Sequence, residues 1–562
     1  MATGKVFEGK PQLENLYVRR CCVLVAVAGS LAVFSGEMRV SLSDPLEWLY
    51  PDSLVAQVRS CAETDVPANG VAEVNVLFNG VEPGKPLSFA SDAADGEWFR
   101  MVDVPVDQNT GPDGAVERLG VTNEFVTRDA PFRVYDALEP LTGGTIVPSA
   151  STVALRFRLR AFSACSGSQD IALTFSQGGS RAVLPFRVNV YAVEVQPVGR
   201  GSFRYTNWMN YNSMAACHGL KPWSPAHLQM IERYARLAVY GRQNMAPLPL
   251  LTLADGSLDE GKYVQLVEIM DRVGIAYLEG PHLCGFSTGK WGAPAFTPRG
   301  STNLTSTAQG AADLAKLAAA FATMIERNGW RGRWYQHVAD EPSEANVLQY
   351  RIACGIVRKY MPGILLADAI ELPDLAGALD VYCTKNHKYE EFRPQYEALR
   401  TRPTDEIWCY TCMFPGGRWM NRLLDNEILR PVLLPWGCRK FGLDGYLHWG
   451  YNQFSPANDP LRKSGTYDAH MGDGLPPGDR NIVYAGSDGP WPSVRLEAMR
   501  QGFEDLELLG MLARRDKTAA DALISRVVRG FGDYTTDPAV YRAARRDLLA
   551  AVSTSGTSKQ AK

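Results

Sequence analysis

The feature that most constrains the fold is an alternation of short apolar runs with longer amphipathic stretches, which begins near residue 202. Eight of these runs have the length of a strand, and most are followed by a stretch of helical length. Strands connected through helices pair in parallel, because each helix returns the chain to the end of the sheet at which the previous strand began. The pattern therefore predicts an eight-stranded parallel (β/α)₈ barrel. The predicted strands are Phe203–Tyr205, Asn244–Leu248, Ala276–Leu278, Arg333–Val338, Leu365–Ala367, Val381–Cys383, Ile407–Tyr410 and Gly445–Trp449.

The chain before the barrel has a different texture. Short apolar runs such as Val74–Phe78 and Phe186–Tyr191 are punctuated by Gly, Pro and Asp, which is typical of an all-β sandwich. After the barrel strands, Ser493–Arg514 carries apolar residues at helical spacing, and a further helix is predicted near Pro538–Val552. We therefore predict a β-sandwich domain at 1–197, a catalytic barrel at 198–515, and a C-terminal helical extension and tail at 516–562.

Charge and composition exclude some classes of partner. The formal net charge is −3 and no long basic run is present, so nucleic acid is not expected as a partner. No stretch reaches the roughly 20 apolar residues of a membrane span. The 11 cysteines show no disulfide-like framework, which favours reduced thiols and a cytoplasmic setting. The run Cys21–Ala28 resembles part of a signal peptide but is interpreted as a strand, with secretion left as the alternative.

Two adjacent acids follow the fourth predicted strand of the barrel. Asp340 and Glu341 come directly after Arg333–Val338, and Pro342, which lacks an N–H, cannot continue the ladder. The acids are therefore expected at the strand's carboxyl end, where barrel enzymes carry their chemistry. Both can face one pocket only if the strand ends or bulges there, because successive side chains of a strand alternate. The alternative is that one acid caps the next helix, beside Ser343.

Four motifs in the barrel region carry a family resemblance, and a fifth lies before it. In order and spacing they are similar to the domain of unknown function 4091, which is the catalytic domain of glycoside hydrolase family 123, and to the β-domain that precedes it. The barrel motifs are His337–Pro342, Trp408–Cys412 with Asn421–Asp425, Gly445–Asn452, and Val483–Gly486 running into Ser493–Asp505, and the earlier one is Thr127–Pro131 with Val134–Asp136.

The resemblance implies an activity and two catalytic residues. The family includes β-N-acetylgalactosaminidases, and its Asp–Glu pair matches Asp340 and Glu341. It implies cleavage of terminal β-linked 2-acetamido sugars, with N-acetylgalactosamine as the expected sugar, and retention through attack by the substrate's own acetamido oxygen. Glu341 would be the general acid and then the base, and should be protonated near neutral pH. Asp340 would stay ionised and orient the acetamido N–H. A carbohydrate substrate and no cofactor are expected.

Polar and aromatic residues at other predicted strand ends are candidates for binding the sugar. The hydroxyl of Tyr410 could hold the acetamido carbonyl oxygen, and the indole of Trp449 could form a floor for the ring. Barrel-wall packing is the alternative for both. The remaining candidates follow strands one, six and eight: Trp208, Asn207, Asn386, His387, Tyr451 and Asn452.

Two other functions stay open. A glycoside hydrolase of different specificity would use a separate second carboxylate, for which Asp368 and Glu371 are candidates after the fifth strand. A non-catalytic carbohydrate-binding protein would keep the aromatic platforms without a productive acid. No metal is expected, because no histidine pair has a compact ligand spacing and the single CxxC, Cys409–Cys412, has no partner pair. The histidines near strand ends are His218, His282, His337, His387 and His448.

Overall fold

The N-terminal part is a sandwich of two five-stranded sheets, as predicted. The computed structural model describes residues 38–56, 58–113, 123–160, 166–463, 466–468 and 473–553, so the predicted strand Cys21–Ala28 lies outside the described residues. The facing sheets meet through aromatic side chains, with the rings of Phe78 and Phe175 5.1 Å apart. One sheet has the order β1 (Arg39–Ser43), β3 (Val71–Asn79), β8 (Thr152–Arg160), β5 (Gly96–Val106), β6 (Phe132–Leu141); the other has the order β2 (Ala62–Pro67), β10 (Ser180–Tyr191), β9 (Gly167–Gln177), β4 (Leu87–Ser91), β7 (Thr145–Ile146).

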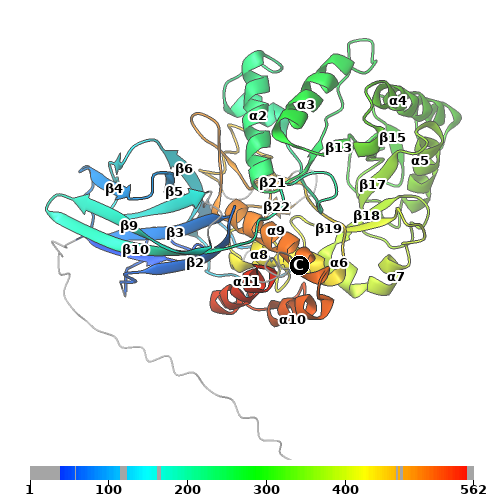
Figure 1. Cartoon of the computed structure of the whole chain (residues 1–562). Coiled ribbons are helices and arrows are strands. Elements are labelled where there is room, and N and C mark those ends of the chain that lie inside the picture. Colours follow the sequence, from blue (N-terminus) through cyan, green and yellow to red (C-terminus); the bar gives the residue numbers. More distant parts are fainter. Residues whose placement is uncertain are drawn as a thin grey trace, which may run out of the picture. The chain divides into compact units, whose positions relative to one another are not determined.

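The second part is an eight-stranded parallel barrel, which confirms the prediction. Figure 1 shows its strands and surrounding helices in green to orange, and the sandwich in blue and cyan. Next to the first strand, the N–H of Asn244 donates to the carbonyl of Tyr205 over 3.2 Å, which brings the two ends of the sheet together. The strands follow the order β11 (Arg204–Asn207), β20 (Gly445–His448), β19 (Glu406–Thr411), β18 (Val381–Lys385), β17 (Leu365–Ile370), β16 (Trp334–Gln336), β13 (Tyr277–Gly280), β12 (Met245–Pro247).

Most predicted helices are present, with shifts at their ends. The stretch of helical length after β18 forms two short helices rather than one, since Pro394 occupies the first turn of the second and cannot donate a backbone hydrogen bond. Helices α1 and α10 were not predicted. The helices are α1 (Tyr211–Cys217), α2 (Pro225–Tyr240), α3 (Glu260–Val273), α4 (Ala308–Arg327), α5 (Val347–Tyr360), α6 (Asn386–Glu391), α7 (Arg393–Glu397), α8 (Leu429–Phe441), α9 (Val494–Ala513), α10 (Lys517–Val527) and α11 (Pro538–Ser553).

Four short hairpins complete the described part. The hairpin β14–β15 is an insertion between β13 and α4 and lies near the carboxyl ends of the barrel strands, because Cys284 N–H donates to the carbonyl of Val338 over 2.8 Å. No helix among the described residues is long and apolar enough to cross a membrane. The hairpins are β14 (Cys284–Phe286) with β15 (Phe296–Pro298), β21 (Thr466–Asp468) with β22 (Asp473–Leu475), β23 (Tyr484–Ala485) with β24 (Pro490–Trp491), and β25 (Val528–Gly530) with β26 (Asp533–Tyr534).

Buried ion pairs join the sandwich to helix α9. Asp136 on β6 accepts from Arg495 at the start of α9 over 2.9 Å, and neither side chain is exposed to solvent. Arg158 on β8 pairs with Glu497 of the same helix over 2.8 Å. Because α9 also packs on α8, the sandwich is tied to the barrel wall by named contacts. The domain limits 1–197, 198–515 and 516–562 stay predictions, since these contacts cross the first of them.

Candidate active site

Asp340 and Glu341 line one cavity at the carboxyl ends of the barrel strands. This central pocket has a volume of about 360 Å³. Strand β16 ends at Gln336, earlier than predicted, because the N–H groups of Val338 and Ala339 donate to the side chain of Asp368 rather than to a neighbouring strand.

The backbone beyond the strand resolves the problem of alternating side chains. Glu341 has φ of 41°, in the left-handed region that non-glycine residues rarely adopt. The regular alternation is broken there, so two successive acids can face the same pocket, and their side chains are 27% and 14% exposed. The capping alternative is wrong, because α5 begins after Asn346, whose side chain accepts from the N–H of Ser343.

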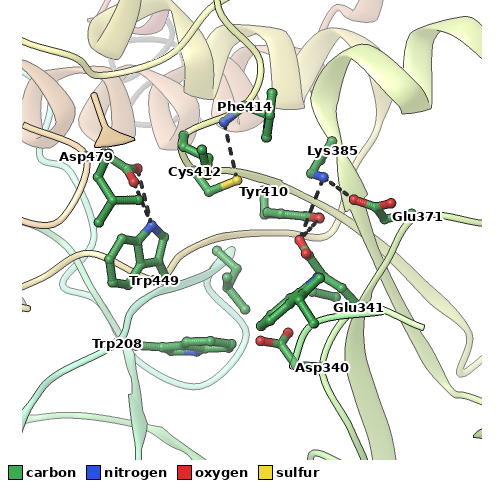
Figure 2. Close-up of a pocket in the computed structure, with 15 residues that line it drawn as sticks. Trp208, Asp340, Glu341, Glu371, Lys385, Tyr410, Cys412, Phe414, Trp449 and Asp479 are labelled. Atoms are coloured by element: carbon green, nitrogen blue, oxygen red, sulfur yellow. Dashed lines mark hydrogen bonds and ion pairs between the residues drawn. The ribbon is translucent and has the colours of Figure 1, made fainter. Parts of the chain in front are cut away.

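Glu341 is held by groups from two other barrel strands, β19 and β18. The Tyr410 hydroxyl donates to Oε1 of Glu341, and Nζ of Lys385 lies 3.9 Å from the same atom. Lys385 also pairs with Glu371, as Figure 2 shows. Burial raises the pKa of Glu341, and Lys385 and the Tyr410 hydrogen bond only partly offset it. The carboxyl therefore has the raised pKa that a general acid needs, as the sequence predicts.

Asp340 differs from its predicted charge state. Burial, with Glu341 and Asp368 nearby, raises the pKa of Asp340 well above its ordinary value. The nearest cation candidate is His282, whose Nε2 lies 3.8 Å from Oδ1 of Asp340, but burial and His337 hold the pKa of His282 well below its usual range. These surroundings favour the protonated form of Asp340. A ligand N–H that donates to this carboxyl would favour the ionised form.

A buried triad of charges supports both the acids and a pocket wall. His337 lies between Asp368 and Glu279, with 3.0 Å from each ring nitrogen to a carboxylate oxygen. Burial alone would lower the pKa of His337, but the two hydrogen bonds raise it to about 10. Glu279 also accepts from the indole of Trp208 over 3.0 Å. Through Asp368 and Glu279, the triad fixes the turn that carries the acids and the indole that lines the pocket.

One group of side chains in the described part has donor atoms close enough for a metal ion. The ligand atoms of His282, His337 and Asp368 lie within 4.8 Å of one another, a cluster that sequence spacing did not reveal because the residues are far apart in the sequence. Both ring nitrogens of His337 already face carboxylates. A cation could bind His337 only by displacing a proton from one of these hydrogen bonds, so the arrangement suits a proton-bearing triad better than a metal centre.

Three of the eight predicted sugar-binding residues line the central pocket. They are Tyr410, Trp449 and Trp208. Figure 2 shows Trp208 nearly edge-on beneath the space between Trp449 and Asp340, with one face of the indole turned to the cavity. The indole N–H of Trp449 donates to both oxygens of Asp479, over 3.2 and 3.1 Å. The aromatic walls are therefore held from behind by buried carboxylates.

The other five predicted residues do not line the central pocket. Asn207, Asn386, Tyr451 and Asn452 are buried, and each is hydrogen-bonded inside the protein. Their partners are Gln243 for Asn207, the Met420 carbonyl for Asn386, the Tyr234 carbonyl for Tyr451, and Asn210 for Asn452. His387 packs its ring against Trp419, with the centroids 5.8 Å apart. The sequence placed these residues near the mouth of the barrel because they follow strand ends, but their side chains pack within the protein instead of facing the central pocket.

The structure adds pocket residues that strand-end reasoning missed. Lys385 is one: strand β18 runs two residues past the predicted end, and a longer prediction would have placed Lys385 at the mouth. Trp291 and Asp479 lie on loops, with no strand signal to reveal them. Of the two alternative second acids, Glu371 lines the pocket, whereas Asp368 is fully buried in the triad.

Comparison with known proteins identifies the family. The model for the glycoside hydrolase 123 catalytic domain matches residues 208–512. This chain belongs to glycoside hydrolase family 123. It is therefore a glycosidase with a carbohydrate substrate.

A solved structure of the same family agrees on the fold. A family 123 glycoside hydrolase from Clostridium perfringens, described in a study of glycolipid glycan hydrolysis, is similar with a TM-score of 0.66 at 10% identity, over 92% of this chain and 97% of that one. A β-glucuronidase from Parabacteroides merdae has a TM-score of 0.32 at 9% identity, over 83% of this chain and 51% of that one. No curated protein matches the chain.

Proposed function

We propose that this glycosidase removes terminal β-linked N-acetylgalactosamine with retention, using the substrate's acetamido oxygen as the nucleophile. The observation that carries the proposal is the adjacent pair Asp340 and Glu341 on one wall of a small aromatic pocket. Of two adjacent acids, one can donate the proton while the other orients the acetamido group. Classical retaining enzymes instead need two carboxyl groups about 5 Å apart, on either side of the anomeric carbon.

Glu341 carries the proton transfer in this mechanism. Its proton goes to the glycosidic oxygen as the bond from that oxygen to the anomeric carbon breaks. The acetamido oxygen forms a bond to the same carbon from the opposite face, giving an oxazolinium ion. Glu341, now ionised, takes a proton from water while the water oxygen bonds to the anomeric carbon. This step breaks the bond from the acetamido oxygen to that carbon, opens the oxazolinium ring and gives overall retention. The raised pKa of Glu341 supports the first step.

Asp340 stabilises the cation that forms in the first step. The acetamido N–H becomes more acidic as positive charge develops on the substrate. A carboxylate that accepts a hydrogen bond from this N–H therefore stabilises the developing cation. Because the pKa of Asp340 is raised, substrate binding that needs the carboxylate is coupled to ionisation of Asp340. Tyr410, which contacts Glu341, is the proposed donor to the acetamido carbonyl, and Trp208 is the proposed platform beneath the ring.

A graded series of substrates tests the nucleophile directly. Aryl β-N-acetylgalactosaminides with zero to three fluorines on the acetyl methyl group keep the shape nearly constant while the carbonyl oxygen becomes less nucleophilic. We expect kcat to fall steeply along the series, and the wild-type product to retain its configuration by NMR. A flat series, or full activity on the matching sugar without the acetamido group, would rule out substrate assistance.

Glu371 supports one rival mechanism. It lines the pocket and its side chain is 41% exposed, so it could act as a separate nucleophile. Asp340→Asn and Glu371→Gln separate the two routes. Substrate assistance predicts a large loss for Asp340→Asn on acetamido substrates and a small one for Glu371→Gln. The classical route predicts the reverse, with activity of Glu371→Gln restored by an added small nucleophile such as azide.

A further inference from the structure

A second cavity adjoins the central pocket. This outer cavity has a volume of about 490 Å³ and shares Trp291 and Asp340 with the central pocket. Much of its wall is the β14–β15 hairpin and the loop between the two strands. The hairpin is an insertion on the barrel rather than a part of its repeating unit, so its shape is free to serve recognition.

Trp291 indicates which part of a glycan would enter the outer cavity. Its indole lies near enough to Glu341 to lower the pKa of that carboxyl, and it lines both hollows. The oxygen that receives the proton of Glu341 belongs to the leaving group and must lie within hydrogen-bond reach of that acid. The leaving group therefore extends past Trp291. This indole is 48% exposed and packs on Phe286 with the ring centroids 5.1 Å apart, which leaves an aromatic surface for a further sugar.

Arg299 supplies the cavity with an uncommitted positive charge. It lines the outer cavity and also a third hollow of about 420 Å³ on the other side of His282. Among the described residues, no carboxylate pairs with its guanidinium, although most other arginines of the barrel have such a partner. A Cβ at Gly285 would lie 3.2 Å from Cζ and Nη1 of Arg299, so a glycine makes room for the guanidinium against strand β14.

We propose that the outer cavity binds the leaving-group portion of an acidic glycan, with Arg299 holding its carboxylate or sulfate group. The proposal rests on the proposed cleavage of a terminal sugar in the central pocket. A guanidinium fork matches the planar pair of oxygens on either anion. Lys385 cannot take this role, because it is already paired with Glu371 and lies beside Glu341.

Charge separation makes this assignment consistent with the acidic central pocket. Asp340, Glu341 and Glu371 line that pocket and would repel an anion placed among them. Glu341 and Glu371 do not line the outer cavity, and Asp340, which does, lies beside His282 on the wall that the two cavities share. An anionic substituent on the leaving group would meet Arg299, while the neutral terminal sugar occupies the central pocket.

Matched disaccharides test the proposal. N-acetylgalactosamine β-linked to glucuronic acid is compared with the same sugar linked to glucose, and a galactose 6-sulfate acceptor is compared with galactose. We expect the wild type to favour at least one acidic member by about 10-fold or more in kcat/KM. Arg299→Gln should bring the ratio near 1, and Arg299→Lys should fall between, because lysine keeps the charge but loses the fork. The carboxylate and sulfate arms identify which anion is recognised.

The control removes one positive charge elsewhere. Arg327 on α4 has a side chain 65% exposed and pairs with Glu260, so Arg327→Gln should keep the wild-type ratio. A wild type with no preference for either acidic member, or a preference that survives in Arg299→Gln, would overturn the proposal. The preference should also weaken as salt is raised from 50 to 500 mM.

A binding measurement separates this proposal from the proposed function. Methyl glucuronide and methyl glucoside are titrated into the full chain by calorimetry, without any turnover. Tighter binding of the acidic glycoside by wild type than by Arg299→Gln supports the acidic subsite even if the terminal sugar is misassigned. If the chain hydrolyses an aryl N-acetylgalactosaminide but binds both methyl glycosides equally, the acidic subsite is contradicted while the proposed function stands.

Discussion

The interface between the sandwich and α9 and the central pocket both contain buried charged side chains, but their hydrogen bonding differs. At the interface between the sandwich and α9, Arg495 donates from Nε and Nη2 to Asp136, and from Nη1 to the carbonyls of Arg422 and Gly478. Tyr484 adds a hydroxyl to Asp136 over 2.6 Å. Nearly all the bonding capacity of these groups is used inside the protein, so the cluster contributes structure.

In the central pocket the bonding capacity is left partly unused. Among the described residues, nothing hydrogen-bonds the carboxylate of Asp340, and Nε2 of His282 has no hydrogen-bond partner. Burial raises the pKa values of both Asp340 and Glu341. Incomplete pairing costs stability in the free protein but leaves groups ready for a ligand. Complete pairing marks a structural cluster here, and incomplete pairing marks the site.

The largest expected effect comes from replacing Glu341 in the central pocket. Glu341→Gln should lower kcat/KM on natural glycans by about 10²–10⁴-fold, because the leaving oxygen is no longer protonated. Aryl glycosides with good leaving groups should lose less. Steady-state kinetics on both substrate classes, with calorimetric titration of the sugar product, check this. Equal losses on both classes would contradict the role of Glu341 as proton donor.

The next largest effect lies on the structural side. Asp136→Ala leaves the Arg495 guanidinium buried without its carboxylate, and should reduce the free energy of unfolding by about 3–5 kcal/mol. Urea denaturation measures it. The matched control is Asp533→Ala, which breaks an exposed pair with Arg529 whose side chains are 59% and 53% exposed. It should cost less than about 1 kcal/mol. Similar losses for both variants would remove the distinction between the two regions.

A smaller effect tests whether the triad acts on catalysis through Trp208. Trp208→Phe keeps an aromatic face but removes the N–H that donates to Glu279. Glu279→Gln keeps the shape but removes the charge. Each should raise KM by about 10-fold, and the double variant should lose less than the product of the two, because both break one interaction. Fully multiplicative losses would show that Glu279 acts on the site by another route.

How far the sequence predicts the fold can be judged from particular strands. The alternation of apolar runs and helical stretches is enough to place all eight barrel strands, because period and length survive without tertiary information. Their ends are less predictable. Strand β16 stops at Gln336 because the side chain of Asp368, about 30 residues further along the chain, accepts from the N–H groups of Val338 and Ala339. No local pattern reports such a long-range acceptor.

The site shows the same division. Asp340, Glu341, Tyr410, Trp449 and Trp208 follow strand ends and line the pocket, as residue order predicts. Residues one or two places further on point either way, and sequence cannot tell which. The side chain of Tyr451 points into the protein and donates to the carbonyl of Tyr234, whereas that of Lys385 lines the central pocket. Trp291 reaches the pocket from the loop of the β14–β15 hairpin, whose path depends on packing rather than on periodicity.

The smallest effect concerns the Tyr410 hydroxyl, which donates to Glu341. The hydrogen bond from Tyr410 lowers the pKa of Glu341, opposing the rise caused by burial. Removing it in Tyr410→Phe should therefore raise that pKa, and the basic limb of the kcat/KM profile, which reports loss of the protonated acid, should move to higher pH by up to about one unit. A pH–rate profile on an aryl glycoside measures the shift. If Tyr410 also holds the acetamido oxygen, the plateau rate should fall by about 10-fold at the same time. A lower plateau with an unmoved limb would assign Tyr410 to the substrate alone, and a limb moved to lower pH would contradict the contact with Glu341.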